Sequence, residues 1–311
     1  MVFGGFGPPE VLDIVELAVP DPGPGQVRVR VLAGGVQPFD TAVRRGVMGV
    51  PVSFPQQIGN EFAGVVDQVG AGVDAWSEGD EVFGWSHMSS LAEYAVAGVD
   101  AIVGKPAGMP WEVAGCLSAS GQTALTALRE LGVGSGDTVL VHAAAGGAGT
   151  MAVQIARAYG AEVIGTAGEA NHEYLIELGA TPITYGDGLV DRVRAAAPNG
   201  VDAVLDAVGG QALRDSLALV RDRSRIGTLV DHDLAVELGV RGIRARRAAE
   251  QLQQLVTLYD RGMLRVHIRA TYPLEAVADA HREVETGHGR GKVVVTLDGG
   301  RYPAHPSPVT T

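Results

Sequence analysis

The sequence predicts an α/β protein in which an irregular antiparallel β-barrel is joined to a doubly wound parallel sheet. Between residues 114 and 265, short apolar strands alternate with helical patterns, the order that produces a parallel sheet. The first 113 residues instead contain short strands separated by Gly and Pro, and residues 266–297 return to a strand, a helix and a strand. We therefore expect two domains, one of residues 1–113 and 266–311 and one of residues 114–265.

The strands of the first domain are expected at 26–32, 63–69 and 81–83. A rigid Pro- and Gly-rich turn precedes the first of them, whose alternating Val and Arg residues from Val27 to Val31 are typical of a half-buried strand. Residues 302–311 are Pro-rich without a periodic pattern, so we expect a loose tail there.

The second domain is expected to contain six strands and five helices. The expected strands are 138–142, 162–166, 182–184, 203–206, 225–230 and 239–245, and the expected helices are 148–159, 172–178, 189–196, 211–219 and 248–261. In a sheet of this kind, ligands bind at the carboxyl ends of the strands.

A glycine-rich turn joins the first strand of the second domain to its first helix. Ala143, Gly146 and Gly149 have the spacing A-x-x-G-x-x-G, a variant of the G-x-G-x-x-G fingerprint. A pyrophosphate can lie on the free N–H groups of a helix N-terminus only where no side chain intervenes, which explains the small residues. The turn therefore predicts a dinucleotide site. Its expected contact residues are Ala145, Gly146, Gly147, Ala148 and Gly149.

Composition narrows the class of protein further. The 311 residues are 46% hydrophobic, enough for two domains with separate cores, and no apolar run approaches the roughly 20 residues of a membrane-spanning helix. The N-terminus lacks the pattern of a secretory signal, so we expect a cytoplasmic location. A net charge of −12 argues against nucleic acid as a partner. The single cysteine, Cys116, excludes an internal disulfide and is expected to be a small buried apolar group.

The residues around the glycine-rich turn also carry a family resemblance. Gly136-Asp137, Leu140, Ala144-Ala145-Gly146-Gly147, Gly149, Gln154 and Arg157 resemble the signature of the quinone oxidoreductase and zeta-crystallin family, a zinc-free branch of the medium-chain dehydrogenase/reductases. The resemblance extends from residue 7 to about residue 297. It implies a GroES-like catalytic domain, a Rossmann domain and a homodimer.

The resemblance also assigns three residues outside the turn to the cofactor. It places Thr123 near the nicotinamide, Tyr185 at the adenine ribose and Lys292 beside the cofactor. The residues alone allow another interpretation of each: Thr123 as a helix cap, Tyr185 as a surface aromatic residue and Lys292 as a solvated cation before the last strand.

The positions that hold a catalytic zinc in alcohol-oxidising members of this superfamily are occupied by other residue types here. Those enzymes use Cys, His and a third Cys or Asp, whereas the corresponding motifs in this sequence present Gln37, Asn60 and Ala119. Amides and a methyl group do not replace thiolate and imidazole as zinc ligands, so we expect no zinc. Hydride transfer without a Lewis acid suits an acceptor that is already electrophilic, such as a quinone or an alkene conjugated to a carbonyl.

The choice of cofactor depends on the end of the strand at 162–166. The acid that usually binds the ribose 2′-OH of NAD is missing there, and Glu169 comes too late in the sequence. This favours NADPH over NADH, although no Arg or Lys occurs between Arg157 and Arg192 to meet a 2′-phosphate. The residues expected to bind that phosphate are Thr166, Gly168, Asn171 and His172.

At the substrate end, Gln37 and Asp40 occupy positions where the family presents polar side chains to the nicotinamide. Gln37 is expected to donate a hydrogen bond to the oxygen of a quinone or enone. Asp40 either orders that donor or a water, or caps the helix expected at 41–45. Phe39 and Ala42 offer no phenol, so the tyrosine acid of related enoyl reductases has no counterpart here. The expected apolar walls of the pocket are Phe39, Phe54, Trp85 and Met88.

These observations favour an NADPH-dependent, zinc-independent reductase of quinones or other activated conjugated carbonyls. The alternatives are an ene-reductase acting on an α,β-unsaturated carbonyl in a biosynthetic pathway and a non-catalytic NADPH-binding protein. Neither a nucleic acid nor a membrane is an expected partner.

Overall fold

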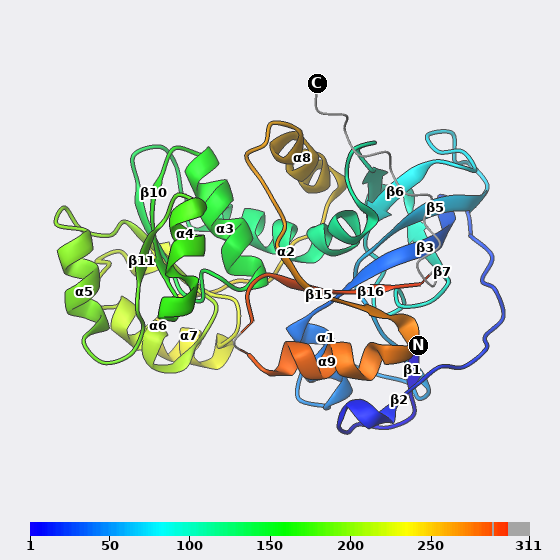
Figure 1. Ribbon diagram of the computed structural model, residues 1–311, viewed down its shortest axis with the longest axis horizontal. Helices are drawn as coiled ribbons and strands as arrows, with labels where there is room; N and C mark the ends of the chain where they lie inside the picture. Colours follow the sequence, from blue (N-terminus) through cyan, green and yellow to red (C-terminus); the bar gives the residue numbers. More distant parts are fainter. Residues whose placement is uncertain (288, 298–311) are drawn as a thin grey trace.

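The computed structural model describes residues 1–287 and 289–297, which form two large sheets in separate lobes (Figure 1). One lobe holds the parallel sheet and the other the mostly antiparallel sheet, and helix α2 (Trp111–Glu130) runs between them. The two predicted fold types are confirmed. The tail expected at 302–311 lies outside the described residues.

The parallel sheet has the strand order β11-β10-β9-β12-β13-β14, and every neighbouring pair in it is parallel. Its strands are β9 (Thr138–Val141), β10 (Glu162–Thr166), β11 (Thr181–Ile183), β12 (Ala203–Asp206), β13 (Ile226–Thr228) and β14 (Arg241–Gly242). The chain begins in the middle with β9, winds to β11 on one side and then returns to build β12 to β14 on the other. The carboxyl ends of β9 and β12, where the winding reverses, form the point at which such sheets bind ligands.

The helices of this lobe alternate with its strands as predicted. They are α3 (Gly147–Ala158), α4 (His172–Glu177), α5 (Leu189–Ala196), α6 (Gly210–Ser216), α7 (His232–Leu238) and α8 (Ala249–Asp260). The sequence prediction missed α7, in which only Leu234 and Ala235 are buried, so its apolar stripe is short. It also made β13 and β14 too long. β14 lies at the edge of the sheet, where it pairs only with β13, and both of its residues are exposed. Burial therefore does not favour a longer strand there.

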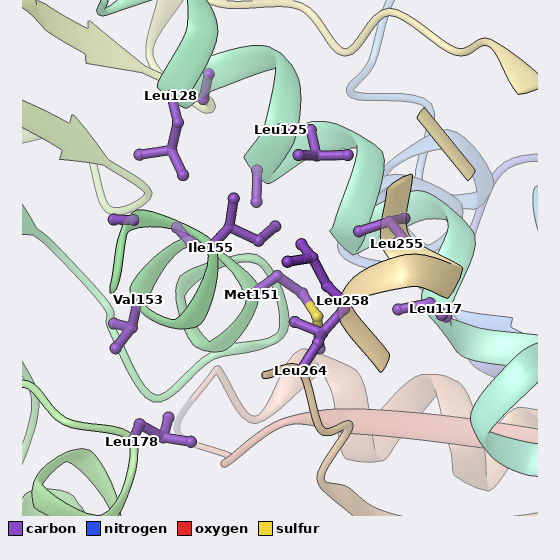
Figure 2. Packing of buried hydrophobic residues seen from close by; sticks show 14 of the residues in the cluster. Leu117, Leu125, Leu128, Met151, Val153, Ile155, Leu178, Leu255, Leu258 and Leu264 are labelled. Atoms are coloured by element: carbon purple, nitrogen blue, oxygen red, sulfur yellow. The ribbon is translucent and has the colours of Figure 1, made fainter. Parts of the chain in front are cut away.

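The largest element that the sequence prediction missed is α2. A surface helix shows an apolar stripe on one face, but α2 is buried on most sides because it lies between the two sheets. Figure 2 shows how it packs: Leu125 and Leu128 of α2 lie near Met151 and Ile155 of α3, and Leu255 of α8 completes the cluster.

The second large sheet is organised around β3 (Gln26–Val36). Its first half pairs with both β5 and β7, and its second half pairs with β16, all antiparallel. The other strands are β5 (Phe62–Val69), β6 (Glu81–Gly84), β7 (Tyr94–Gly98), β8 (Ile102–Gly104), β15 (Ile268–Pro273) and β16 (Lys292–Thr296), and a small sheet contains β1 (Val2–Phe3), β2 (Leu12–Asp13) and β4 (Gln56–Gln57).

The C-terminal segment of the described chain joins this N-terminal sheet. β15 and β16 are parallel, which corrects the expectation of a purely antiparallel barrel, because helix α9 (Val277–Glu285) forms the crossover between them. β16 thereby lies beside β3, and the start of β16 is held against the other lobe: Gly291 N donates to Ala145 O at 2.9 Å. The domain boundaries at residues 113/114 and 265/266 stay predictions.

Helix α1 (Pro38–Arg44) begins three residues before the helix expected at 41–45. Pro38 is its first residue, a position where proline is favoured because the N–H it lacks would have no partner there. Within the described part of the chain, no helix combines the length and the hydrophobicity needed to cross a membrane.

Candidate active site

The glycine-rich turn leads from β9 into α3 at the reversal point of the parallel sheet. Gly146 N donates to Ala143 O at 3.0 Å, and Thr150 N donates to Gly146 O at 2.8 Å, which starts the helix. The N–H groups of Gly147, Ala148 and Gly149 belong to the first turn and have no acceptor within the helix. They provide the positive helix end that binds a pyrophosphate.

Two glycines of this turn are required by different neighbours. A Cβ at Gly149 would lie 2.2 Å from Ala143 O, a backbone atom, so this glycine lets α3 pack against the turn. A Cβ at Gly147 would lie 3.0 Å from the Lys292 side chain and 3.2 Å from Ser120 Oγ. Gly146 is the least crowded of the three: a Cβ there would meet only Ala143 O, at 3.3 Å, a tight contact that a shift of a few tenths of an ångström would relieve. The turn therefore fits a dinucleotide phosphate that approaches beside Gly146.

His142 lies beneath the turn, directly after β9. Its Nδ1 is 3.2 Å from Thr166 Oγ1 and its Nε2 is 3.1 Å from Ser216 Oγ. Burial lowers the pKa of His142, so the neutral ring joins the two hydroxyls. Thr166 also accepts from Ala143 N at 3.3 Å. The Thr166 hydroxyl, expected at the ribose phosphate, thus supports the turn from below.

The ends of β10 and β11 bring the other predicted ribose contacts together. A Cβ at Gly168 would lie 3.8 Å from Tyr185 Oη, so the exposed tyrosine leans over this glycine. His172 Nε2 lies 3.5 Å from Thr184 Oγ1 and faces the strand ends. Asn171 accepts at Oδ1 from the side chain of Arg290 at 3.1 Å, a residue that the sequence prediction missed.

A buried polar cluster lies beside the turn, at the junction of the two lobes. Glu61 is fully buried and accepts three hydrogen bonds: from Lys292 Nζ at 3.0 Å, from Ala119 N at 2.6 Å and from Gln37 Nε2. Lys292 also donates to Ser120 Oγ at 3.2 Å. The cluster shows that Lys292 is 3% exposed and forms a buried ion pair, so the solvated interpretation of Lys292 is wrong.

Asp40 and Asn60 form the second half of the cluster. Asp40 Oδ2 accepts from Gln37 N at 2.8 Å, which caps α1 from its third helical position, and Asp40 Oδ1 accepts from Asn60 Nδ2 at 2.6 Å. Burial raises the pKa of Asp40 to about 6, although both hydrogen bonds favour the ionised form. Asp40 therefore takes part in capping, as one of the two interpretations expected, but it does so from inside α1 and not as the residue before a helix at 41–45.

Arg247 completes the charges around the cluster. It donates from Nη1 to Asn60 O at 3.0 Å, and burial lowers the pKa of its guanidinium while Glu61 and Asp40 raise it. The site therefore holds two buried carboxyl groups opposite two cations, from segments far apart in the sequence. Four of its side chains were identified from the sequence: Gln37, Asp40, Asn60 and Lys292. Glu61 and Arg247 were given no role, and no local motif marks Arg247.

The three positions considered for zinc hold Gln37, Asn60 and Ala119, and the first two are tied into the cluster by side-chain hydrogen bonds. Among residues 1–287 and 289–297, no group of three His, Cys, Asp or Glu side chains is placed to hold a metal ion. Cys116 is fully buried, and burial raises the pKa of its thiol well above its usual range, as expected for an apolar structural residue. The absence of a catalytic metal stays a prediction.

Thr123 and the predicted apolar walls lie in different environments. Thr123 lies inside α2, where its Oγ1 donates to Ala119 O at 2.7 Å, so the helix-cap interpretation is wrong. Phe54 stacks edge-on against Phe3 and Phe6, with ring centroids 5.7 and 5.1 Å away. Beside Phe6 lies an apolar cleft of about 340 Å³, lined by Phe6, Val43, Gly46, Met48, Gly49, Val50 and Pro51.

The remaining wall residues are partly covered by the protein core. Phe39 packs with the cluster around β1 and β16, and Trp85 packs between two core clusters. Met88 has a left-handed backbone with φ of 49°, and its N–H donates to Asn60 Oδ1 at 3.3 Å. The roles of these side chains toward a substrate stay predictions.

Comparison with known proteins identifies the family. The family model described as alcohol dehydrogenase GroES-like domain matches residues 23–109, and the model described as zinc-binding dehydrogenase matches residues 178–295. Human quinone oxidoreductase is 32% identical over an alignment of 315 positions, gaps included, which covers 94% of this chain and 95% of that protein. The chain belongs to the quinone oxidoreductase family of the medium-chain dehydrogenase/reductases. The resemblance inferred from the glycine-rich turn is thereby confirmed.

Two further relatives extend the comparison. The crystal structure of Escherichia coli quinone oxidoreductase complexed with NADPH has a TM-score of 0.85 and 27% identity, covering 95% of this chain and 98% of that one. The spectinabilin polyketide synthase system protein NorB of Streptomyces orinoci is 33% identical over 291 residues, which cover 88% of this chain and 13% of that protein.

The two kinds of glycine in the turn predict two kinds of defect. In Gly149→Ala the new methyl meets a backbone carbonyl, so we expect a loss of unfolding free energy of about 2 kcal/mol or more. In Gly146→Ala the backbone, with φ of −70°, accepts alanine, so we expect near-normal stability but about tenfold weaker dinucleotide binding. Urea unfolding and titration with NADPH measure the two effects. Equal stability of the two variants would contradict this packing.

Asp40 predicts a pH dependence of stability. Its pKa is higher in the folded protein, about 6, than its ordinary value of 3.8, so the folded state holds the extra proton between these values. The stabilisation is complete below about pH 4 and is lost as the pH rises through about 6. Relative to the wild type, Asp40→Asn should therefore gain unfolding free energy from about pH 4 to pH 7, by about 1–3 kcal/mol.

Urea unfolding across this pH range tests the sign, and Asp137→Asn serves as the matched control. The hydrogen bond from Arg225 lowers the pKa of Asp137 below its ordinary value of 3.8, so the stability that this carboxyl adds is lost only below about pH 4. The difference between Asp137→Asn and the wild type should therefore stay nearly constant from about pH 4 to pH 7. A pH-independent difference for Asp40→Asn would refute the raised pKa.

Proposed function

We propose that the chain is an NADPH-dependent oxidoreductase that transfers hydride to a quinone without a metal. The observation that carries the proposal is the direct contact between the glycine-rich turn and the buried polar cluster. The Lys292 side chain lies where a Cβ at Gly147 would touch it, and its ammonium group is paired with Glu61. A dinucleotide on the turn would thus lie next to polar groups able to orient an acceptor. The similarity to human quinone oxidoreductase supports this acceptor class.

The residues of the turn fit NADPH in a defined way. The free N–H groups of Gly147, Ala148 and Gly149 would hold its pyrophosphate, and Gly168 and Tyr185 would border its adenine ribose. When bound, NADPH supplies a hydride from its nicotinamide ring. The E. coli relative binds NADPH, which favours this dinucleotide over NADH.

Gln37 is the proposed donor to the acceptor oxygen. Its Nε2 gives one hydrogen to Glu61, which is itself fixed by Ala119 N and Lys292. Because a carboxylate only accepts hydrogen bonds, the end of the Gln37 amide that faces Glu61 is its NH₂ group. The second N–H of that group remains available to a ligand. Negative charge develops on the quinone oxygen as hydride arrives, and a preoriented donor in a buried site stabilises it without reorganisation. The cationic Arg247 adds to this stabilisation.

A second acceptor class is an alkene conjugated to a carbonyl in a biosynthetic pathway. The similarity to a segment of the polyketide synthase system protein NorB favours it, and the same amide would then polarise the carbonyl oxygen. The homodimer implied by the family is likewise a proposal. The third possibility is a non-catalytic NADPH-binding protein, in which NADPH occupies the glycine-rich turn but no acceptor is reduced.

The first test is NADPH oxidation by chelator-treated protein with parallel panels of quinones and enones. We expect turnover of quinones that is unchanged by the chelator, because no step depends on a metal. Turnover of enones alone would identify the ene-reductase, and NADPH binding without turnover would indicate the non-catalytic alternative. Activity restored only by added metal would contradict the zinc-independent mechanism.

Gln37→Ala tests the donor. Removing the amide should lower kcat for quinones about tenfold or more, since a lost donor to a developing oxyanion typically costs at least this factor, while the Kd of NADPH stays within about twofold. Glu61 keeps Lys292 and Ala119 N as partners, so the fold should persist. Steady-state kinetics and NADPH titration separate the two effects.

Gln154→Ala is the matched control, because Gln154 is as buried as Gln37, with 7% against 8% exposure. Its hydrogen bonds go to Thr150 O within α3 and to the backbone of Arg265, and none goes to the buried polar cluster. We expect normal kcat for this variant. Unchanged turnover in Gln37→Ala would remove Gln37 from the mechanism.

A further inference from the structure

Arg290 lies beside the loop that follows β10, where it contacts Asn171, a residue 119 positions earlier in the chain. Its Nε donates to Asn171 Oδ1 at 3.1 Å, and its Nη2 donates to Ala170 O at 3.2 Å. Its guanidinium carbon lies 4.6 Å from the ring centroid of Tyr174, over the face of the ring. Two hydrogen bonds and one stacking contact therefore fix the plane of the guanidinium group.

The position of Arg290 follows from the way the C-terminal segment crosses to the parallel sheet. Gly291, the next residue, donates to Ala145 O at 2.9 Å and forms a parallel bridge with Gly146. The backbone pairing of Gly291 with the glycine-rich turn thus places the preceding residue, Arg290, beside the loop after β10. In doubly wound sheets the residues after the second strand read the adenine ribose and its 2′ substituent.

Two other arginines near this loop are held by acceptors that leave them in structural roles. Arg192 donates to the carbonyl oxygens of Thr184, Tyr185, Gly186 and Asp187, and so closes the turn after β11. Arg269 is paired with Glu283 at 2.8 Å. Arg290, in contrast, has no carboxylate partner within hydrogen-bonding or ion-pair distance among residues 1–287 and 289–297.

We propose that Arg290 binds the 2′-phosphate of NADPH and sets the preference for NADPH over NADH. The inference rests on the proposed use of NADPH and adds the residue that recognises its phosphate. A guanidinium group binds phosphate with paired, charge-assisted hydrogen bonds. Asn171 lies beside the guanidinium group: its Oδ1 accepts from Arg290, which identifies the other end of the amide as Nδ2, a group with two N–H donors. Arg290 thus provides the cation that is missing between Arg157 and Arg192 in the sequence.

The test compares ligands that differ only in the phosphate, using calorimetric titration of the full chain. For Arg290→Ala we expect about tenfold to a hundredfold weaker binding of NADPH and of 2′,5′-ADP, the range typical of a lost charge-assisted contact. Binding of NADH and 5′-AMP should change less than about threefold, because they lack the contacted group. Arg290→Lys, which keeps the charge without the planar fork, should bind NADPH with intermediate affinity.

Arg265→Ala is the matched control. Arg265 is a nearby exposed cation paired with Glu177, and it shares with Arg290 an electrostatic effect on Tyr174. Its removal tests the general positive field, and the ratio of the NADH and NADPH dissociation constants should stay at its wild-type value. An equal change of that ratio in Arg265→Ala and Arg290→Ala would overturn the assignment to Arg290.

Two further outcomes would overturn the proposal. Equal weakening of NADPH and NADH in Arg290→Ala would mean that Arg290 contacts the pyrophosphate or only supports the loop, and unchanged affinities would remove it from the site. If Arg290→Ala does not fold, Arg290→Lys and Arg290→Gln provide the same comparison. Wild-type protein that binds neither dinucleotide would contradict the proposed function itself, whereas NADPH binding without quinone turnover would leave the role of Arg290 intact.

Discussion

The structure depends on one buried ion pair at the junction of its two lobes. Lys292 and Glu61 are almost completely removed from water and lie 3.0 Å apart. Breaking such a pair by removing one partner typically costs ~3–5 kcal/mol, since an uncompensated charge remains buried. Further polar groups are therefore needed around the pair. Glu61 accepts from the Gln37 amide and from Ala119 N, and Lys292 donates to Ser120 Oγ. Gln37 directly precedes α1, Ala119 and Ser120 lie in α2, and Lys292 begins β16, so the charge requirement also fixes where the lobes meet.

The same requirement explains how the site accommodates amides where metal ligands stand in related dehydrogenases. Gln37 and Asn60 hydrogen-bond to the carboxyl groups of Glu61 and Asp40, and burial raises the pKa of Asp40. Arg247 approaches the cluster through Asn60 O and interacts electrostatically with both carboxyl groups. The polar core is thus internally neutralised by the chain's own side chains, which makes the orientation of the Gln37 amide a property of the fold.

Local patterns predicted the parts of the fold that depend on neighbours in sequence. The glycine-rich turn and the strands around it were placed within one or two residues, because turn geometry and strand burial depend on short segments. Helix α2 was missed because burial on most sides removes the one-sided stripe that marks a helix. The Lys292–Glu61 pair and Arg247 were beyond reach for another reason: residues 231 positions apart form the pair, and only the packing of β16 against β3 brings them together.

Arg290 shows what this limit means for predicting cofactor choice. The missing acid after β10 makes the ribose end the expected point of cofactor choice, but no Arg or Lys occurs in the neighbouring sequence before Arg192, which donates to backbone carbonyls. The cation arrives instead from the strand that closes the other lobe. Because Gly291 is hydrogen-bonded to the turn that would bind the pyrophosphate, any shift of that strand would move Arg290 and the turn together. The contact that joins the lobes therefore couples the proposed recognition of the ribose end to the placement of the buried polar cluster, because only Gly291 separates Arg290 from Lys292.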